Sequence, residues 1–352
     1  MAYTTINKPS QYFNTLLYTG NGSARTITGV GFQPDWVWVK DRTSANSHYL
    51  YDILRGNNLN IFSNDTSAEV NVTTGQNGGG VGSQASDGFT IVAGLVNTNN
   101  VNTNTNLYAS WNWLANGAGV SNTDGTITST VSANTTSGFS IVSYTGTGVN
   151  ATIGHGLGVR PSFIIVKVRD TANAPTCQHI SLGAGNRVNL SSTAASASAP
   201  TFWNSTEPTS SVFSVGTEDI TNNNGNTYIA YCFAEVKGYS KFGSYTGNGN
   251  ADGTFTYCGF SPAFIMIKRT DSADDWVIID NRRTAFNSDS KFLYANVSDA
   301  EESLTGRFDF LSNGFKIRNS WTKINASGGA YIYIAFAQNP FVSSTLIPVT
   351  AR

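Results

Sequence analysis

Residues 34–40 of the chain read Pro34-Asp35-Trp36-Val37-Trp38-Val39-Lys40, and the pattern returns at residues 161–167 and 262–268. Each copy has a proline, five mostly apolar residues and a lysine. Bulky side chains stand two and four places after the proline, and β-branched ones stand three and five places after it. Apolar residues on both faces predict a strand that is covered on both sides. A second sheet would cover one face, and a loop, a neighbouring domain or another subunit would cover the other.

Two further blocks recur in the same order around this strand. A Tyr-Thr-Gly-x-Gly turn precedes it, and an aromatic-rich strand follows it. The turns start at Tyr18, Tyr144 and Tyr245, and the closing blocks are residues 108–113, 228–233 and 331–336. Copies more than 100 residues apart exceed the 20 to 50 residues of solenoid repeats, so each copy is predicted to be a whole domain.

The turn signals and short apolar segments predict an all-β protein. We expect three tandem β-sandwich, jelly-roll-like domains of about 100 residues each. The expected domains are residues 1–117, 129–237 and 238–340, with a Gly-rich linker at 118–128 and a C-terminal tail at 341–352. Residues 191–200, rich in Ser and Ala, predict a long loop, and residues 298–302 resemble a capped helical turn.

The composition argues against several classes of function. Only 12 % of the residues are charged and the net charge is −1, which argues against a nucleic-acid partner. The N-terminus lacks a basic stretch followed by an apolar core, and no apolar run approaches the ~18 to 20 residues of a membrane helix. We therefore expect no signal peptide and no membrane insertion.

Catalytic and metal-binding patterns are absent from the sequence. The three Cys and three His residues have no zinc spacing, and no nucleophile elbow or phosphate-binding lysine loop occurs. The adjacent carboxylates Asp274-Asp275 and Glu301-Glu302 are interpreted as solvated surface charge, because neighbouring strand residues point to opposite faces. We expect no enzymatic activity, no catalytic residue, no metal and no cofactor.

One ionic pattern links the first and third copies. Asp52 and Arg55 follow the first lysine at the same steps as Asp280 and Arg283 follow the third. The second copy has His179 and Leu182 there instead. A structural salt bridge that fixes a turn is the simpler interpretation, and a ligand site repeated in two domains is the alternative.

Three tryptophans are candidates for contact with a ligand or partner. Trp36, Trp38, Trp111 and Trp113 fall in predicted strands and are assigned to the core. Trp203, Trp276 and Trp321 lie nearer to predicted turns. There an aromatic side chain could stack on a sugar or, more commonly, lie at a sandwich rim or an interface.

Four long segments carry a family resemblance: Tyr-Thr-Gly-Asn-Gly, residues 31–42, residues 237–247 and the ending at 347–352. With them the chain resembles a family of virion structural proteins of marine tailed phages, including cyanophages, over nearly its whole length. The resemblance implies a tail-fibre-like or appendage protein without an assigned activity, made in the host cytoplasm and located in the virion. The absence of heptads and of a Gly-x-y run favours a compact appendage or a capsid-decoration module over a long fibre.

Two functional hypotheses follow. The first is a non-enzymatic structural protein of a tailed bacteriophage that docks on other capsid or tail components and forms homo-oligomers. The alternative is a carbohydrate-binding adhesin that recognises a host surface glycan through Trp203, Trp276 or Trp321 and mediates host attachment.

Overall fold

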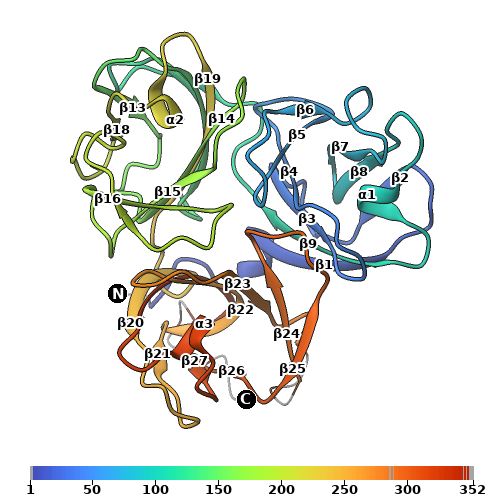
Figure 1. The fold of residues 1–352 in the computed structure, drawn as a ribbon, viewed down its shortest axis with the longest axis vertical. Helices are drawn as coiled ribbons and strands as arrows, with labels where there is room; N and C mark the ends of the chain where they lie inside the picture. Colours follow the sequence, from blue (N-terminus) through green and yellow to red (C-terminus); the bar gives the residue numbers. More distant parts are fainter. Residues whose placement is uncertain (1–2, 285–286, 288, 344, 346, 349–352) are drawn as a thin grey trace.

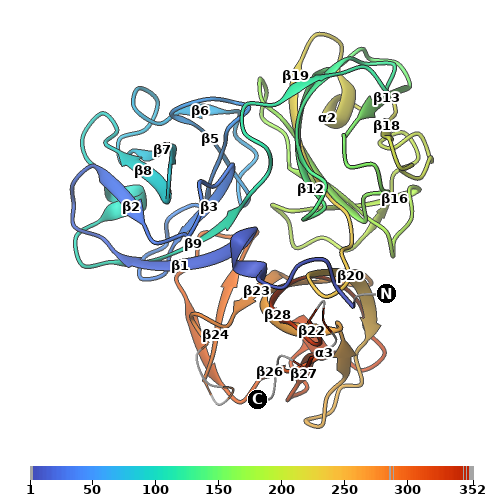
Figure 2. The same ribbon diagram turned by 180° about the vertical axis from the view of Figure 1, so that it is seen from behind.

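The computed structural model describes residues 3–284, 287, 289–343, 345 and 347–348. Three pairs of antiparallel sheets form three lobes around a common centre (Figures 1 and 2). We call them unit 1 (residues 9–113), unit 2 (residues 120–233) and unit 3 (residues 240–340). The all-β fold predicted from the sequence is confirmed, and the division into three independent domains stays a prediction.

Unit 1 has a large sheet in the order β1-β9-β3-β4-β5-β6 and a small sheet in the order β2-β8-β7. Both sheets contribute side chains to one core, so they form a sandwich. Its elements are η1 (Pro9–Gln11), β1 (Phe13–Thr19), β2 (Arg25–Thr28), β3 (Trp36–Asp41), β4 (Tyr49–Asp52), β5 (Leu59–Phe62), β6 (Val70–Asn71), β7 (Gly80–Ala85), β8 (Gly88–Val92), α1 (Asn99–Asn102) and β9 (Leu107–Trp113).

Unit 2 has a large sheet in the order β10-β11-β12-β19-β14-β15-β16-β17 and a small sheet of β13 and β18. Its elements are β10 (Val120–Asn122), β11 (Ser129–Asn134), β12 (Phe139–Thr145), β13 (Ala151–Gly154), β14 (Phe163–Val168), β15 (Thr176–His179), β16 (Asn186–Asn189), β17 (Ala197–Ser198), β18 (Val212–Val215), α2 (Asp219–Asn222) and β19 (Thr227–Phe233). Strand β10 lies where the sequence predicts a linker. It pairs with β11 as the sheet edge, because a polar Gly-rich segment can still donate ladder hydrogen bonds.

Unit 3 repeats the arrangement of unit 1, with sheets β20-β28-β22-β23-β24-β25 and β21-β27-β26. Residues 298–301 form no helix, and β25 begins at Glu302, so the predicted capped turn is wrong. Its elements are β20 (Ser240–Thr246), β21 (Phe255–Tyr257), β22 (Phe260–Arg269), β23 (Trp276–Asp280), β24 (Asp289–Tyr294), β25 (Glu302–Thr305), β26 (Phe308–Leu311), β27 (Gly314–Ile317), α3 (Thr322–Asn325) and β28 (Ala330–Pro340).

The repeated strand is buried on both faces in every unit, as the alternation predicts. In β3, Val37 and Val39 pack between the two sheets of unit 1, whereas Trp36 and Trp38 point toward the other units. Strands β14 and β22 divide their side chains in the same way. The sequence left open what covers the second face, and the structure answers it: the neighbouring units do.

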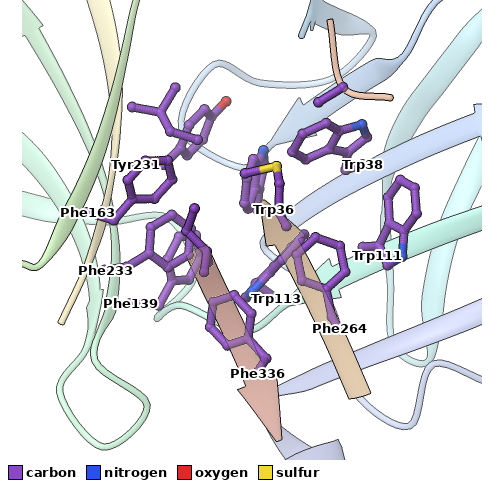
Figure 3. Close-up of a cluster of buried hydrophobic side chains, with 14 of the residues drawn as sticks. Trp36, Trp38, Trp111, Trp113, Phe139, Phe163, Tyr231, Phe233, Phe264 and Phe336 are labelled. Carbon is purple, nitrogen blue, oxygen red and sulfur yellow. The ribbon is translucent and has the colours of Figure 1, made fainter. Parts of the chain in front are cut away.

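The three large sheets therefore share a central aromatic core (Figure 3). The ring of Trp36 lies 4.4 Å from that of Trp113 and 4.4 Å from that of Tyr231 in unit 2, centroid to centroid. Phe264 and Phe336 of unit 3 close the cluster against Trp113 at 6.0 and 5.7 Å. Each such ring buries roughly 150 to 250 Å², so this core is a major source of cohesion between the units.

Candidate functional site

The contacts between the units contain buried hydrogen bonds and ion pairs. The lysine of each repeated strand, predicted only as the last residue of a motif, is fully buried. Its ammonium group donates to a backbone carbonyl of another unit. These contacts are Lys40 to Ser298 at 2.9 Å, Lys167 to Thr66 at 3.1 Å and Lys268 to Thr193 at 3.0 Å.

The direction of these contacts is cyclic. Unit 1 donates to unit 3, unit 3 donates to unit 2, and unit 2 donates to unit 1. Each lysine also donates to at least one carbonyl of its own unit. Burial lowers the pKa of each lysine to about 8, so all three remain mainly protonated at neutral pH.

Two of the three contacts carry a bidentate arginine–carboxylate pair two residues beyond the lysine. Arg42 Nη2 lies 2.7 Å from Glu301 Oε1, and Arg169 Nη2 lies 2.8 Å from Glu69 Oε1. Burial raises the pKa of Glu301, but the hydrogen bonds and charges of Arg42 and Arg283 outweigh it and hold that pKa below its usual value. Glu301 is thus an ion-pair partner and not the solvated charge expected from the sequence.

The candidate pairs Asp52–Arg55 and Asp280–Arg283 belong to the same contacts. Arg55 Nε lies 2.5 Å from Asp52 Oδ2, Arg283 Nε lies 2.6 Å from Asp280 Oδ2, and all four side chains are fully buried. The same carboxylate oxygens accept hydrogen bonds from neighbouring units. Tyr231 Oη donates to Asp52 at 2.7 Å, and Trp111 Nε1 donates to Asp280 at 3.0 Å.

Both carboxylate oxygens of Asp52 and of Asp280 accept hydrogen bonds from groups of the protein, so these ion pairs are structural. The other oxygen of Asp280 accepts backbone N–H groups of Arg282 and Arg283 at 3.1 and 2.9 Å, and Asp52 accepts the corresponding pair. Glu69 and Glu301 each join the arginine of the neighbouring unit to the buried arginine of their own unit. The arrangement supports the interpretation as salt bridges over that of a repeated ligand site.

In unit 2, the position of Asp52 and Asp280 is occupied by His179. Ser181 N–H donates to its Nδ1 at 3.1 Å, so Nε2 carries the proton and donates to Tyr333 O of unit 3 at 3.3 Å. Burial lowers the pKa of His179 to about 4. A neutral imidazole thus replaces an ion pair at the contact between units 2 and 3.

The candidate tryptophans lie in three different environments. Trp203 is fully buried in the core of unit 2, and Trp276 is fully buried in the central core with its Nε1 donating to Asn189 O of unit 2 at 2.9 Å. Neither can present a ring face to a sugar, which corrects that expectation, although Trp276 does lie at a contact between units. Trp321 is half-buried against Phe292 and the guanidinium of Arg307.

The N-terminal segment closes the ring of units. Ile6 inserts into the central core, and Thr4 is buried. Tyr3 Oη donates to Gly259 O of unit 3 at 2.7 Å. Two adjoining surface hollows of about 630 and 430 Å³ follow this segment, and both are lined by Tyr3, Glu235 and Lys237.

The cysteine thiols lie inside the fold. Cys177, Cys232 and Cys258 are free and buried, and burial raises the pKa of all three thiols. Throughout the described residues, no group of three or more His, Cys, Asp or Glu side chains could hold a metal ion. No helix in that part of the chain has the length and apolarity needed to cross a membrane.

The comparisons with known proteins give a family without a function. The family model of DUF7483, a domain of unknown function, matches residues 8–340. The chain belongs to this family. The match spans the residues of all three units. No curated protein matches the chain.

Proposed function

We propose that this protein is a non-enzymatic structural component of a tailed-bacteriophage particle, a peripheral β-sandwich module that docks on capsid or tail proteins. The observation that carries the proposal is the use of the buried charges. Buried lysine, arginine, aspartate and glutamate side chains bind neighbouring units, so they serve cohesion. The resemblance of the repeated motifs to virion proteins of marine tailed phages supplies the context.

The docking surface differs from the one that the sequence suggests. The second apolar face of the repeated strands, which suggested assembly, is covered inside the chain by the other units. Contact with another virion protein, or with a second copy, must therefore use other surface. Exposed aliphatic side chains occur at Leu95, Val96, Val120 and Val149, each at least 62 % exposed.

The test is the location and copy number of the chain in purified particles. An antibody against the chain, viewed on intact virions, is expected to label the particle, and gel band intensity against the major capsid protein gives the number of copies. Labelling over the head indicates a decoration protein, and labelling at the tail indicates an appendage. A chain that stays in the host lysate and never sediments with particles would refute the proposal.

A further inference from the structure

Strand β21 carries two aromatic side chains that units 1 and 2 lack. Phe255 and Tyr257 are 43 % and 54 % exposed on the outer face of the small sheet. Tyr257 pairs with Gly314, at the place where Thr28 pairs with Gly88 in unit 1. The corresponding residue of unit 2 is Gly154, opposite Val212. Because the fold is built twice without these rings, stability of the sandwich does not account for them.

Tyr257 also lines the smaller of the two hollows along the N-terminal segment. Its hydroxyl lies 3.4 Å from that of Tyr3, which is fixed by its bond to Gly259 O. Lys237 Nζ lies 4.6 Å from the ring centre of Tyr3. Two aromatic rings and a cation are thus brought together from the N-terminal segment and from residues 237–257.

The rest of the lining is polar and open to solvent. Lys241 lies 2.7 Å from Glu235, and both side chains are more than one third exposed. The larger hollow adds the hydroxyl-bearing residues Thr5, Thr135 and Thr136. The charged lining residues are two lysines and one glutamate. The groove therefore combines aromatic surface, hydroxyl groups and a net positive charge.

We propose that this groove binds an acidic oligosaccharide, one built from uronic acid units. The C–H face of a pyranose ring packs on an aromatic ring, while its hydroxyls bond to polar groups at the rim. A sugar carboxylate forms a charge-assisted hydrogen bond with a lysine. Each hollow is within the range of roughly 300 to 1,000 Å³ of ligand sites, and together they offer more than one sugar subsite. This binding activity goes beyond the structural role proposed above.

The test is calorimetric titration of the full-length protein with hexamers of galacturonate, mannuronate and guluronate, and with cellohexaose as the neutral comparison. Saturable binding of at least one acidic hexamer is expected, weakened at high salt. Tyr257→Ala and Lys237→Gln should each weaken binding about tenfold or more, whereas Tyr257→Phe and Lys237→Arg should retain most of it. Leu107→Ala changes an apolar residue of unit 1 that is 44 % exposed and lies outside both hollows, and it should have no effect.

Three results of the titrations would overturn the proposal. These are failure of all three acidic hexamers to bind, binding of cellohexaose with equal affinity, and binding that Tyr257→Ala leaves unchanged. Thermal unfolding of each variant checks that the fold is intact. Sedimentation velocity adds a further outcome: if the chain self-associates and Tyr257→Ala or Phe255→Ala abolishes it, the aromatic surface is a protein contact instead. None of these results depends on where the chain lies in the particle.

Discussion

The contact between units 2 and 3 differs from the other two in how its polar groups are satisfied. Where the other contacts place an arginine and a glutamate, this one has Thr270 and Ser196, joined by a backbone hydrogen bond of 2.9 Å. Where they place an Asp–Arg pair facing Trp111 or Tyr231, it has His179. The residue of unit 3 at the position of Trp111 and Tyr231 is Ile334, whose side chain has no hydrogen-bond donor.

The difference shows that the polar residues on the two sides of a buried contact differ as a set from one contact to the next. An apolar Ile334 in place of a donor removes one reason for a carboxylate opposite, and a buried carboxylate without its arginine would be strongly destabilising. His179 satisfies both ring nitrogens with backbone groups and brings no charge into the core. Two contacts are thus ionic and one is neutral, although all three keep the hydrogen bond from the motif lysine to a carbonyl of the neighbouring unit.

The largest effect is expected from breaking one buried ion pair. Asp280→Asn removes the charge that Arg283 and Trp111 share and leaves the buried Arg283 with Glu301 as its remaining carboxylate partner, so the free energy of unfolding should fall by about 3 kcal/mol. Urea unfolding followed by tryptophan fluorescence measures this. Asp52→Asn at the equivalent contact is the matched variant and should lose a similar amount. If both losses stay below about 1 kcal/mol, the pairs do not stabilise the contacts.

The neutral contact should weaken in acid through His179. His179 has a pKa of about 4 in the folded protein and about 6.5 when unfolded, so the unfolded state binds more protons between these values. Its contribution is complete above pH 6.5 and is lost as pH falls through 4, by about 1.4 kcal/mol per pH unit. Unfolding measured from pH 4 to 7 should show a shallower slope for His179→Gln than for the wild type. His48 and His155 remain in both proteins, so an unchanged slope would contradict the assignment.

A smaller loss is expected at the carboxylates that bridge two arginines. Glu301→Gln leaves Arg42 and Arg283 with a weaker acceptor and should cost about 2 kcal/mol, and Glu69→Gln at the other ionic contact should cost about the same. Glu207→Gln is the control, because the Arg160–Glu207 pair is more than 40 % exposed on both sides and should change the stability by less than about 0.5 kcal/mol. Equal losses at all three positions would mean that burial does not strengthen these pairs.

The smallest effect is expected from making the neutral contact ionic. Ser196→Glu combined with Thr270→Arg places a pair where units 2 and 3 already share a backbone hydrogen bond. The double variant should be more stable than the sum of the single variants by about 0.5 to 1 kcal/mol, since this pair lacks the second arginine that Glu69 and Glu301 contact. A double-mutant cycle from urea unfolding measures the coupling. A coupling of zero would mean that the two side chains do not meet.

The motif repeat was sufficient to predict the all-β fold, the strands and the burial of both their faces. The alternation of Trp36, Val37, Trp38 and Val39 states which side chains share a face, because the side-chain period of a strand is two residues. The same information does not show what lies against each face. The hydrogen bonds of Lys40, Lys167 and Lys268 to other units therefore could not be predicted, although the three lysines stand at identical places in the motif.

The candidate tryptophans also show that a local sequence pattern does not determine whether a side chain is exposed. Trp203 and Trp276 stand near predicted turns, a position that is compatible with exposure, yet both are fully buried. Their environment depends on segments far away in the sequence, such as Asn189 for Trp276. The sequence did not single out the exposed Tyr257 as a candidate, because its neighbours Tyr3 and Lys237 lie more than 200 and about 20 residues away along the chain.

The sequence by itself determined the fold class, the three copies and the pairing of each Asp with the arginine three residues later, because these follow from short-range periodicity and fixed spacing. Only the tertiary structure decided that the copies close into a ring and that the central faces of their large sheets bury one another. It also decided which charges meet across the contacts and where an aromatic groove remains open. The physical reason is that burial and electrostatic pairing are set by distance in space, and a local pattern specifies only direction along its own strand.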